Sequence, residues 1–167
     1  ARVSGMNRAS LWSGTAASWT DLNPVGSVDS YAHAITDDVQ VGFARVGGID
    51  RASMWRGTAA SWVDLTPPGA GSAGSNALAA SGSMQVGYAD VNGTTRASLW
   101  SGTADSWVDL HPPQAVWSYA FGVSGSQQVG RAYISSDWHA SLWSGGAESW
   151  VDLNPPGSTG GNAMAVN

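Results

Sequence analysis

A motif that recurs four times along the chain constrains the fold more than any other feature. Each copy is a five-residue stretch that ends in Ser-Leu-Trp or Ser-Met-Trp, and the copies are Arg8–Trp12, Arg51–Trp55, Arg96–Trp100 and His139–Trp143. Their Trp residues are separated by 43, 45 and 43 positions in a chain of 167 residues. Recurrence at this period indicates a repeat architecture, in which one structural unit is built several times.

Each repeat contains four short stretches of alternating residues, separated by Gly, Pro, Asp and Ser turns. In the first complete repeat these stretches are 30–35, 40–46, 51–55 and 62–65. Alternation with a period of two predicts antiparallel strands, and no apolar period of 3.6 runs long enough for a helix. Four strands in about 43 residues is the size of one propeller blade, so the sequence predicts an all-β fold.

The chain begins in the second strand of one repeat and ends in the first strand of another. Residues 1–3 align with 44–46, and residues 163–166 align with 120–123. We therefore expect one domain over residues 1–167, a small β-propeller of four blades with four antiparallel strands each. Three N-terminal strands and one C-terminal strand would share a blade and close the ring, which removes exposed sheet edges. The expected blade units are 1–23 plus 158–167, 28–66, 73–111 and 116–154. A fragment of a larger ring is the structural alternative.

Polar residues recur together with the Trp motif and have two interpretations. If a hairpin pairs Trp12 with Trp19, Ser10 lies opposite Asp21 and Arg8 lies diagonal to that Asp. The equivalent pairs are Ser53 with Asp64, Ser98 with Asp109 and Ser141 with Asp152. One interpretation is four sugar sites, each with aromatic rings and a carboxylate. The favoured interpretation is a scaffold, in which each polar face packs on the apolar face of the next sheet and its polar groups hydrogen-bond one another.

Positions that depart from the repeat are the candidate binding residues. Trp117 and Trp138 are expected in loops, and an exposed Trp on a loop commonly contacts a ligand or partner. His139 replaces the Arg of the other three motifs, and a structural substitute is the favoured interpretation. The candidate set is Trp117, Trp138, Tyr119 and His139. A further histidine, His33, is expected to be a buried, hydrogen-bonded core residue.

Composition excludes several classes of function. The chain has 7 Lys plus Arg against 12 Asp plus Glu, a net charge of −5, so nucleic acid is not an expected partner. It has no Cys, which excludes disulfides, thiolate metal sites and cysteine nucleophiles. The three His share no spacing for a metal or for catalysis, and no catalytic motif occurs. No apolar run approaches the roughly 20 residues of a transmembrane segment. The sequence therefore predicts no enzyme, no metal and no cofactor.

The repeated unit resembles the HAF repeats of bacterial extracellular proteins. The likeness rests on Ala-x-Leu-Trp, the following Asp-Leu, the small-residue stretch 31–35 and Gln-Val-Gly at 40–42, and it covers nearly the whole chain. Arg-Ala-Ser replaces His-Ala-Phe in three units, and a polar residue plus Pro follows Asp-Leu where the family usually has Gly. The resemblance implies a secreted or surface-exposed, propeller-like repeat protein. It transfers no catalytic residues.

Two functions follow as expectations. The leading one is a non-enzymatic, extracellular or cell-surface binding module, lectin-like, with carbohydrate as its ligand because Trp is abundant and charge is low. The alternative is a structural or accessory subunit of a larger assembly that buries Trp117 and Trp138 in a partner protein. The expected partner is accordingly a glycan or another protein.

Overall fold

The computed structural model describes all residues from Ala1 to Asn167, and every extended element in it is an antiparallel β-strand. The strands are β1 (Arg2–Val3), β2 (Met6–Asn7), β3 (Ser10–Leu11), β4 (Thr20–Asp21), β5 (Ser27–Thr36), β6 (Val39–Val46), β7 (Ile49–Trp55), β8 (Val63–Asp64), β9 (Ala70–Ser81), β10 (Met84–Val91), β11 (Thr94–Trp100), β12 (Val108–Asp109), β13 (Trp117–Ser124), β14 (Gln127–Ile134), β15 (Asp137–Trp143) and β16 (Val151–Asp152). Four 3₁₀ turns, η1 (Ala16–Ser18), η2 (Ala59–Ser61), η3 (Ala104–Ser106) and η4 (Ala147–Ser149), precede the short fourth strands.

Each of the three complete repeats forms one four-stranded sheet. Strands β5–β8 form sheet 1, β9–β12 form sheet 2 and β13–β16 form sheet 3, each paired in chain order. The hairpins β1–β2 and β3–β4, here called the N-terminal unit, carry the incomplete repeat. The all-β class and the four strands per repeat are thus confirmed, because alternation and turn residues are local signals.

Neighbouring units pack face to face through one recurring contact. The Trp of each third strand is fully buried in a cluster with an Ala and a Leu of the unit before it: Trp55 with Ala9 and Leu22, Trp100 with Ala52 and Leu65, and Trp143 with Ala97 and Leu110. The expected alternation of a polar and an apolar face is confirmed. The direction was wrong, since each polar face packs on the preceding sheet and not on the next one.

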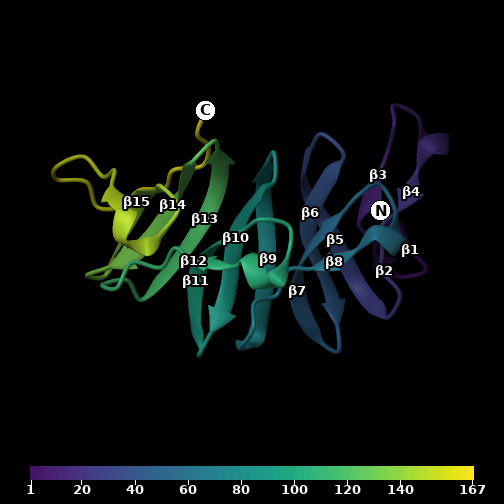
Figure 1. The fold of residues 1–167 in the computed structure, drawn as a ribbon, viewed down its shortest axis with the longest axis horizontal. Coiled ribbons are helices and arrows are strands. Elements are labelled where there is room, and N and C mark those ends of the chain that lie inside the picture. Colours follow the sequence, from purple (N-terminus) through teal and green to yellow (C-terminus); the bar gives the residue numbers. More distant parts are fainter.

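The sheets do not close into a ring, so the expected four-bladed propeller is wrong for this structure. Figure 1 shows the sheets side by side in a row, with the purple N-terminal unit at one end and sheet 3, coloured green to yellow, at the other. Residues 158–167 form no strand and lie on sheet 3, where Gly161 N–H donates to the Trp138 carbonyl and Ala163 N–H to that of Gly130. The repeat specifies how neighbours pack. It does not specify whether the rotations between them add up to a full turn.

The Gln-Val-Gly motif has a local structural role. A Cβ on Gly42 would lie 1.8 Å from the Tyr31 carbonyl oxygen, beside a bulge where the β5–β6 register shifts between Ala32 and Ala34. The buried Gln40 accepts a hydrogen bond from Gly57 N–H at 2.8 Å and donates to the Asp38 carbonyl at 2.9 Å. Gln85, Gly87, Gln128 and Gly130 repeat these contacts. The motif therefore bulges the first strand and fixes the loop after the third.

Candidate functional site

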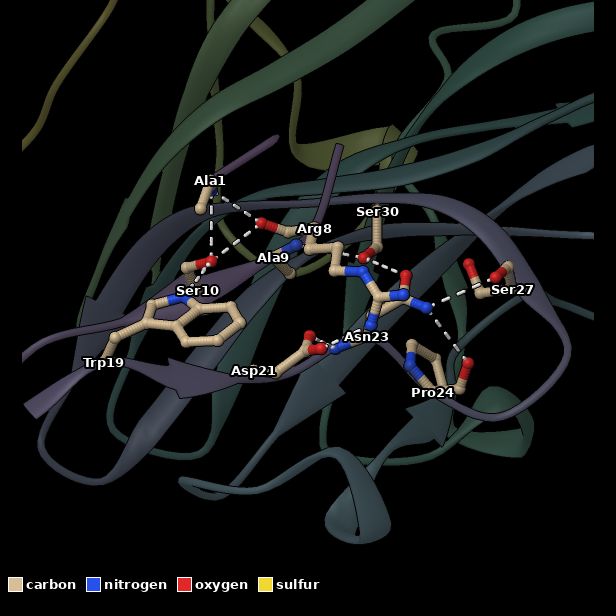
Figure 2. Close-up of polar contacts among 10 residues, drawn as sticks. All are labelled: Ala1, Arg8, Ala9, Ser10, Trp19, Asp21, Asn23, Pro24, Ser27 and Ser30. Carbon is tan, nitrogen blue, oxygen red and sulfur yellow. Dashed lines mark hydrogen bonds and ion pairs between the residues drawn. The ribbon is translucent and has the colours of Figure 1, made fainter. Parts of the chain in front are cut away.

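The repeated Ser, Asp, Trp and Arg residues, with His139 in place of Arg in sheet 3, form a hydrogen-bond network within each unit. Figure 2 shows its first copy, in which Arg8 binds Asp21 at 2.5 Å and Trp19 Nε1–H donates to Ser10 Oγ at 2.9 Å. The predicted pairing of Ser10 with Asp21 is confirmed, as are the three equivalent pairs. Asp21 also accepts from Asn23 N–H at 2.9 Å. Because these groups bind one another, the network stabilises the hairpin as the scaffold interpretation predicts.

A second network joins each unit to the next one. Ser30 Oγ, on β5, accepts from the buried Ala9 N–H at 3.0 Å and donates to Asn23 Oδ1 at 2.6 Å. Figure 2 shows this contact beside the first. Ser75 with Ala52 and Thr66, and Ser118 with Ala97 and His111, repeat it at 2.8 to 2.9 Å. We call these three sites the serine bridges.

His111 belongs to the last serine bridge and is buried. Its Nε2 lies 3.0 Å from the Ala115 carbonyl, which can only accept, so Nε2 carries the proton and Nδ1 accepts from Ser118 Oγ. Burial lowers the pKa of His111, and the positive charge of Arg96 lowers it further, against the opposing effects of Asp109 and the Ala115 carbonyl. The ring therefore acts as a neutral structural group.

The site that departs from the repeat is an aromatic cluster on sheet 3. Tyr133 on β14 packs between Trp117 on β13 and Trp138 on β15, with ring centroids 5.2 and 5.0 Å away. Tyr119 lies 5.9 Å from Trp138. The Arg131 guanidinium sits 3.9 Å from the Trp138 ring centroid and 5.1 Å from that of Tyr119, within the range of cation–π attraction. These five residues are called the aromatic cluster below.

Cross-strand pairing places the cluster on one face of sheet 3. Trp117 pairs with Tyr133, Tyr133 pairs with Trp138, and Tyr119 pairs with Arg131, and directly opposed residues point to the same face. In sheet 1 the same register positions as Tyr133 and Trp138 hold an ion pair, Arg45 with Asp50 at 2.6 Å. Sheet 3 therefore has two aromatic residues at the positions where sheet 1 has an ion pair. Trp117 is the most open member, with 42% of its surface exposed.

The structure unites three of the four predicted binding residues and separates the fourth. Trp117, Trp138 and Tyr119 meet in the aromatic cluster, but both Trp residues lie in strands rather than in loops, because their pairing with Tyr133 extends the ladder. His139 faces the other side of β15 and binds Asp152 at 2.8 Å, in the place of the repeated Arg. It therefore belongs to the scaffold network.

Two cluster members, Arg131 and Tyr133, were missed by the sequence reasoning. Arg131 aligns with Phe43 and Tyr88, so it breaks the repeat in the same way as the two Trp residues. Hairpin pairing between 131–134 and 137–140 would have placed both beside Trp138. The signal was present as an unusual pair of residues on a predicted strand.

His33 is exposed, so the expectation of a buried core residue was wrong. It lies at the bulge of β5, which turns its side chain out of the sheet core, and its Nε2 is 3.3 Å from Asn76 Nδ2. Its ring stacks with Tyr31 at 6.4 Å between centroids. The partial desolvation that remains lowers the pKa of His33.

No group of three or more His, Asp or Glu side chains is placed to hold a metal ion. The chain's helices are turns of three residues, and none has the length or apolar character needed to span a membrane. In comparisons with known proteins, no family model, no curated protein and no solved structure matches the chain.

Proposed function

We propose that this chain is a non-enzymatic, exported binding protein that holds a carbohydrate on the aromatic cluster of sheet 3. The observation that carries the proposal is the gathering of Trp117, Tyr133 and Trp138 on one face, where the other complete sheets have no Trp. Sheet 1 also stacks aromatic rings on this face, Tyr31 on Phe43, so the feature specific to sheet 3 is the pair of Trp side chains.

The chemistry of the cluster suits a neutral sugar. The electron-rich face of an aromatic ring attracts the weakly positive C–H groups that line one side of a pyranose ring. The Arg131 guanidinium offers several N–H donors in a fixed plane for sugar hydroxyls. One of them donates to Asn162 Oδ1 at 3.3 Å, which orients the group beside the rings.

Binding to a microarray of neutral and acidic oligosaccharides tests the proposal, followed by calorimetry with the strongest saccharide. Trp117→Ala is expected to weaken binding by about tenfold or more, as for a central contact residue. Trp138→Ala is expected to act similarly. Trp19→Ala removes a partly exposed Trp of the N-terminal unit and is the matched control, with binding unchanged.

Two results would contradict the proposal. A folded protein that binds no saccharide on the array would overturn the proposal and favour the accessory-subunit alternative. Saccharide binding that survives both Trp117→Ala and Trp138→Ala would place the ligand elsewhere on the chain.

A further inference from the structure

The same interface forms three times between neighbouring units. The two end units each expose one side of a further interface of this kind. The Trp of the third strand is fully buried at positions 55, 100 and 143, but its equivalent in the N-terminal unit, Trp12, is 48% exposed. The Leu after the fourth strand is fully buried at positions 22, 65 and 110, but its equivalent in sheet 3, Leu153, is 43% exposed. In each internal contact these two residue types come from opposite sides of the same interface.

The two exposed halves lie at opposite ends of the row of sheets. Trp12 follows β3 in the N-terminal unit, and Leu153 follows β16 in sheet 3, at the two ends seen in Figure 1. We call them the Trp12 face and the Leu153 face. Since they are separated by the whole row, they do not cover each other within the structure.

We propose that the Trp12 face of one molecule packs on the Leu153 face of a second copy of this chain, head to tail, in the manner of the three internal interfaces. The occupant follows from continuity with those interfaces, because one face carries the Trp and the other the Leu that each internal interface buries. Such a contact joins two different surfaces, so it is heterologous and can extend to further copies.

The backbone N–H group that the internal interfaces pair with a serine is already hydrogen-bonded on the Leu153 face. The Ala140 N–H, whose equivalents in the preceding units bind serines of the next unit, is satisfied by Asn154 Oδ1 at 2.9 Å within sheet 3. Residues 161–165 of the same chain already lie beside Ala140 and Gly122 on this face, in the place that the first strand of the next unit takes in the internal interfaces. Because Asn154 already accepts from Ala140, the second copy needs no serine at this position to make the contact. Unpaired buried N–H groups would otherwise oppose it.

A recess beside the exposed Trp12 indole opens between the N-terminal unit and sheet 1. A pocket of about 280 Å³ is lined in part by Leu11, Trp12, Ala34 and Ile35, where β3 meets β5. Ile35 is itself largely exposed. The recess is also lined by Ser10, His33 and Gln40. An exposed Trp next to a partly apolar recess is typical of a surface that is covered by a partner.

The aromatic cluster lies at the rim of the same face of sheet 3, and this interface leaves part of it accessible. Arg45 and Asp50 stand at the same rim of sheet 1 and remain 42% and 32% exposed in their side chains, although sheet 2 covers that face. A second copy packed on sheet 3 in the same way would leave Trp117 open. The inference therefore does not depend on the proposed saccharide binding.

Two charged substitutions test the head-to-tail contact. Residues 1–167 are expected to form dimers and larger species whose proportion rises with concentration in sedimentation velocity. Trp12→Glu blocks one face and Leu153→Glu blocks the other, so each variant alone is expected to be monomeric. Mixed together, they are expected to form a dimer of one chain of each, because one intact face of each kind remains. Val25→Glu, at a fully exposed turn, is the control and should associate as the unmodified chain does.

Three results would overturn the proposal. The first is an unmodified chain that stays monomeric at every concentration. The second is a Trp12→Glu variant that associates as well as the unmodified chain. The third is a mixture of the two variants that stays monomeric. Far-UV circular dichroism of each variant confirms that it is folded. Should either Glu variant unfold, Trp12→Ser and Leu153→Ser replace them in the same mixing experiment, with the same three results decisive.

Discussion

The Ser118 hydroxyl, on the first strand of sheet 3, accepts a hydrogen bond at 2.8 Å from the backbone N–H of Ala97, on the third strand of sheet 2. Both residues are fully buried. The contact crosses from one sheet to the next, and it has equivalents at Ser30 and Ser75. Stacked sheets normally join through side chains alone. Here a polar bond also fixes the register of one sheet against its neighbour.

Removal of this bond should cost stability. Ser118→Ala leaves the buried Ala97 N–H and His111 Nδ1 without a partner, so the free energy of unfolding is expected to fall by about 1–3 kcal/mol. Urea denaturation followed by Trp fluorescence measures the change. Ser101→Ala, at an exposed position, is the matched control and should shift it by no more than about 0.5 kcal/mol. Equal effects for the two variants would contradict the bridging role.

The glycine of Gln-Val-Gly should tolerate no side chain. In Gly87→Ala the new Cβ would lie 1.9 Å from the Asn76 carbonyl oxygen, so the β9–β10 pairing must shift, and we expect a loss well above about 3 kcal/mol or an insoluble protein. Gly93→Ala is the comparison, since Gly93 has open space and a φ of 76°, which costs about 1–2 kcal/mol for a residue with a Cβ. Thermal unfolding of both variants gives the ranking, and a milder effect at Gly87 would contradict the steric argument.

The neutral state of His111 should make stability depend on pH. Its pKa in the folded protein lies below the ordinary value of 6.5, so the unfolded chain binds a proton more readily. Neutral His111 contributes fully to the free energy of unfolding above pH 6.5. This contribution is lost as the pH falls from 6.5 through the lower pKa of the folded protein. His111→Asn places the residue found at positions 23 and 154 and should flatten the dependence between about pH 7 and 5. Urea titrations across this range measure the slope, and His33 is unchanged in both proteins. An unchanged slope in His111→Asn would show that other groups are responsible.

A substitution at His139 should leave saccharide affinity unchanged. His139→Arg restores the residue of the other three repeats, and Arg remains charged at every ordinary pH beside Asp152. The pair is partly exposed, so we expect a gain of no more than about 1 kcal/mol in unfolding free energy. Saccharide affinity in calorimetry should not change, because His139 and the aromatic cluster lie on opposite faces of β15. A clear loss of affinity would mean that the site extends through the sheet.

The repeats of Trp, Asp and Gln-Val-Gly were sufficient to predict the strands, the hairpin pairing and the scaffold network. These features depend on residues at most about twenty positions apart, so alternation and turns report them directly. The bulge at Ala32–Ala34 was not predicted, and with it the exposure of His33, because a register shift depends on how closely the Tyr31 carbonyl approaches Gly42.

The candidate site was only partly predictable. Trp117, Trp138 and Tyr119 attracted attention because they break the repeat, yet their common location depends on Tyr133, whose ring lies between both Trp residues. Arg131 enters the cluster for the same reason. A residue that departs from the repeat can be recognised from its position in the sequence alone. To recognise that several such residues form a cluster, the pairing of three strands must also be known.

The amino-acid sequence by itself determined the repeating unit, its four strands and the faces that they present, because each depends on local alternation and on contacts within one hairpin. The tertiary structure alone decided that the units form an open row, with Trp12 and Leu153 exposed at its two ends. The physical reason is that each interface sets a small rotation between neighbours. Only the sum of these rotations, which no single repeat encodes, determines whether the first unit meets the last.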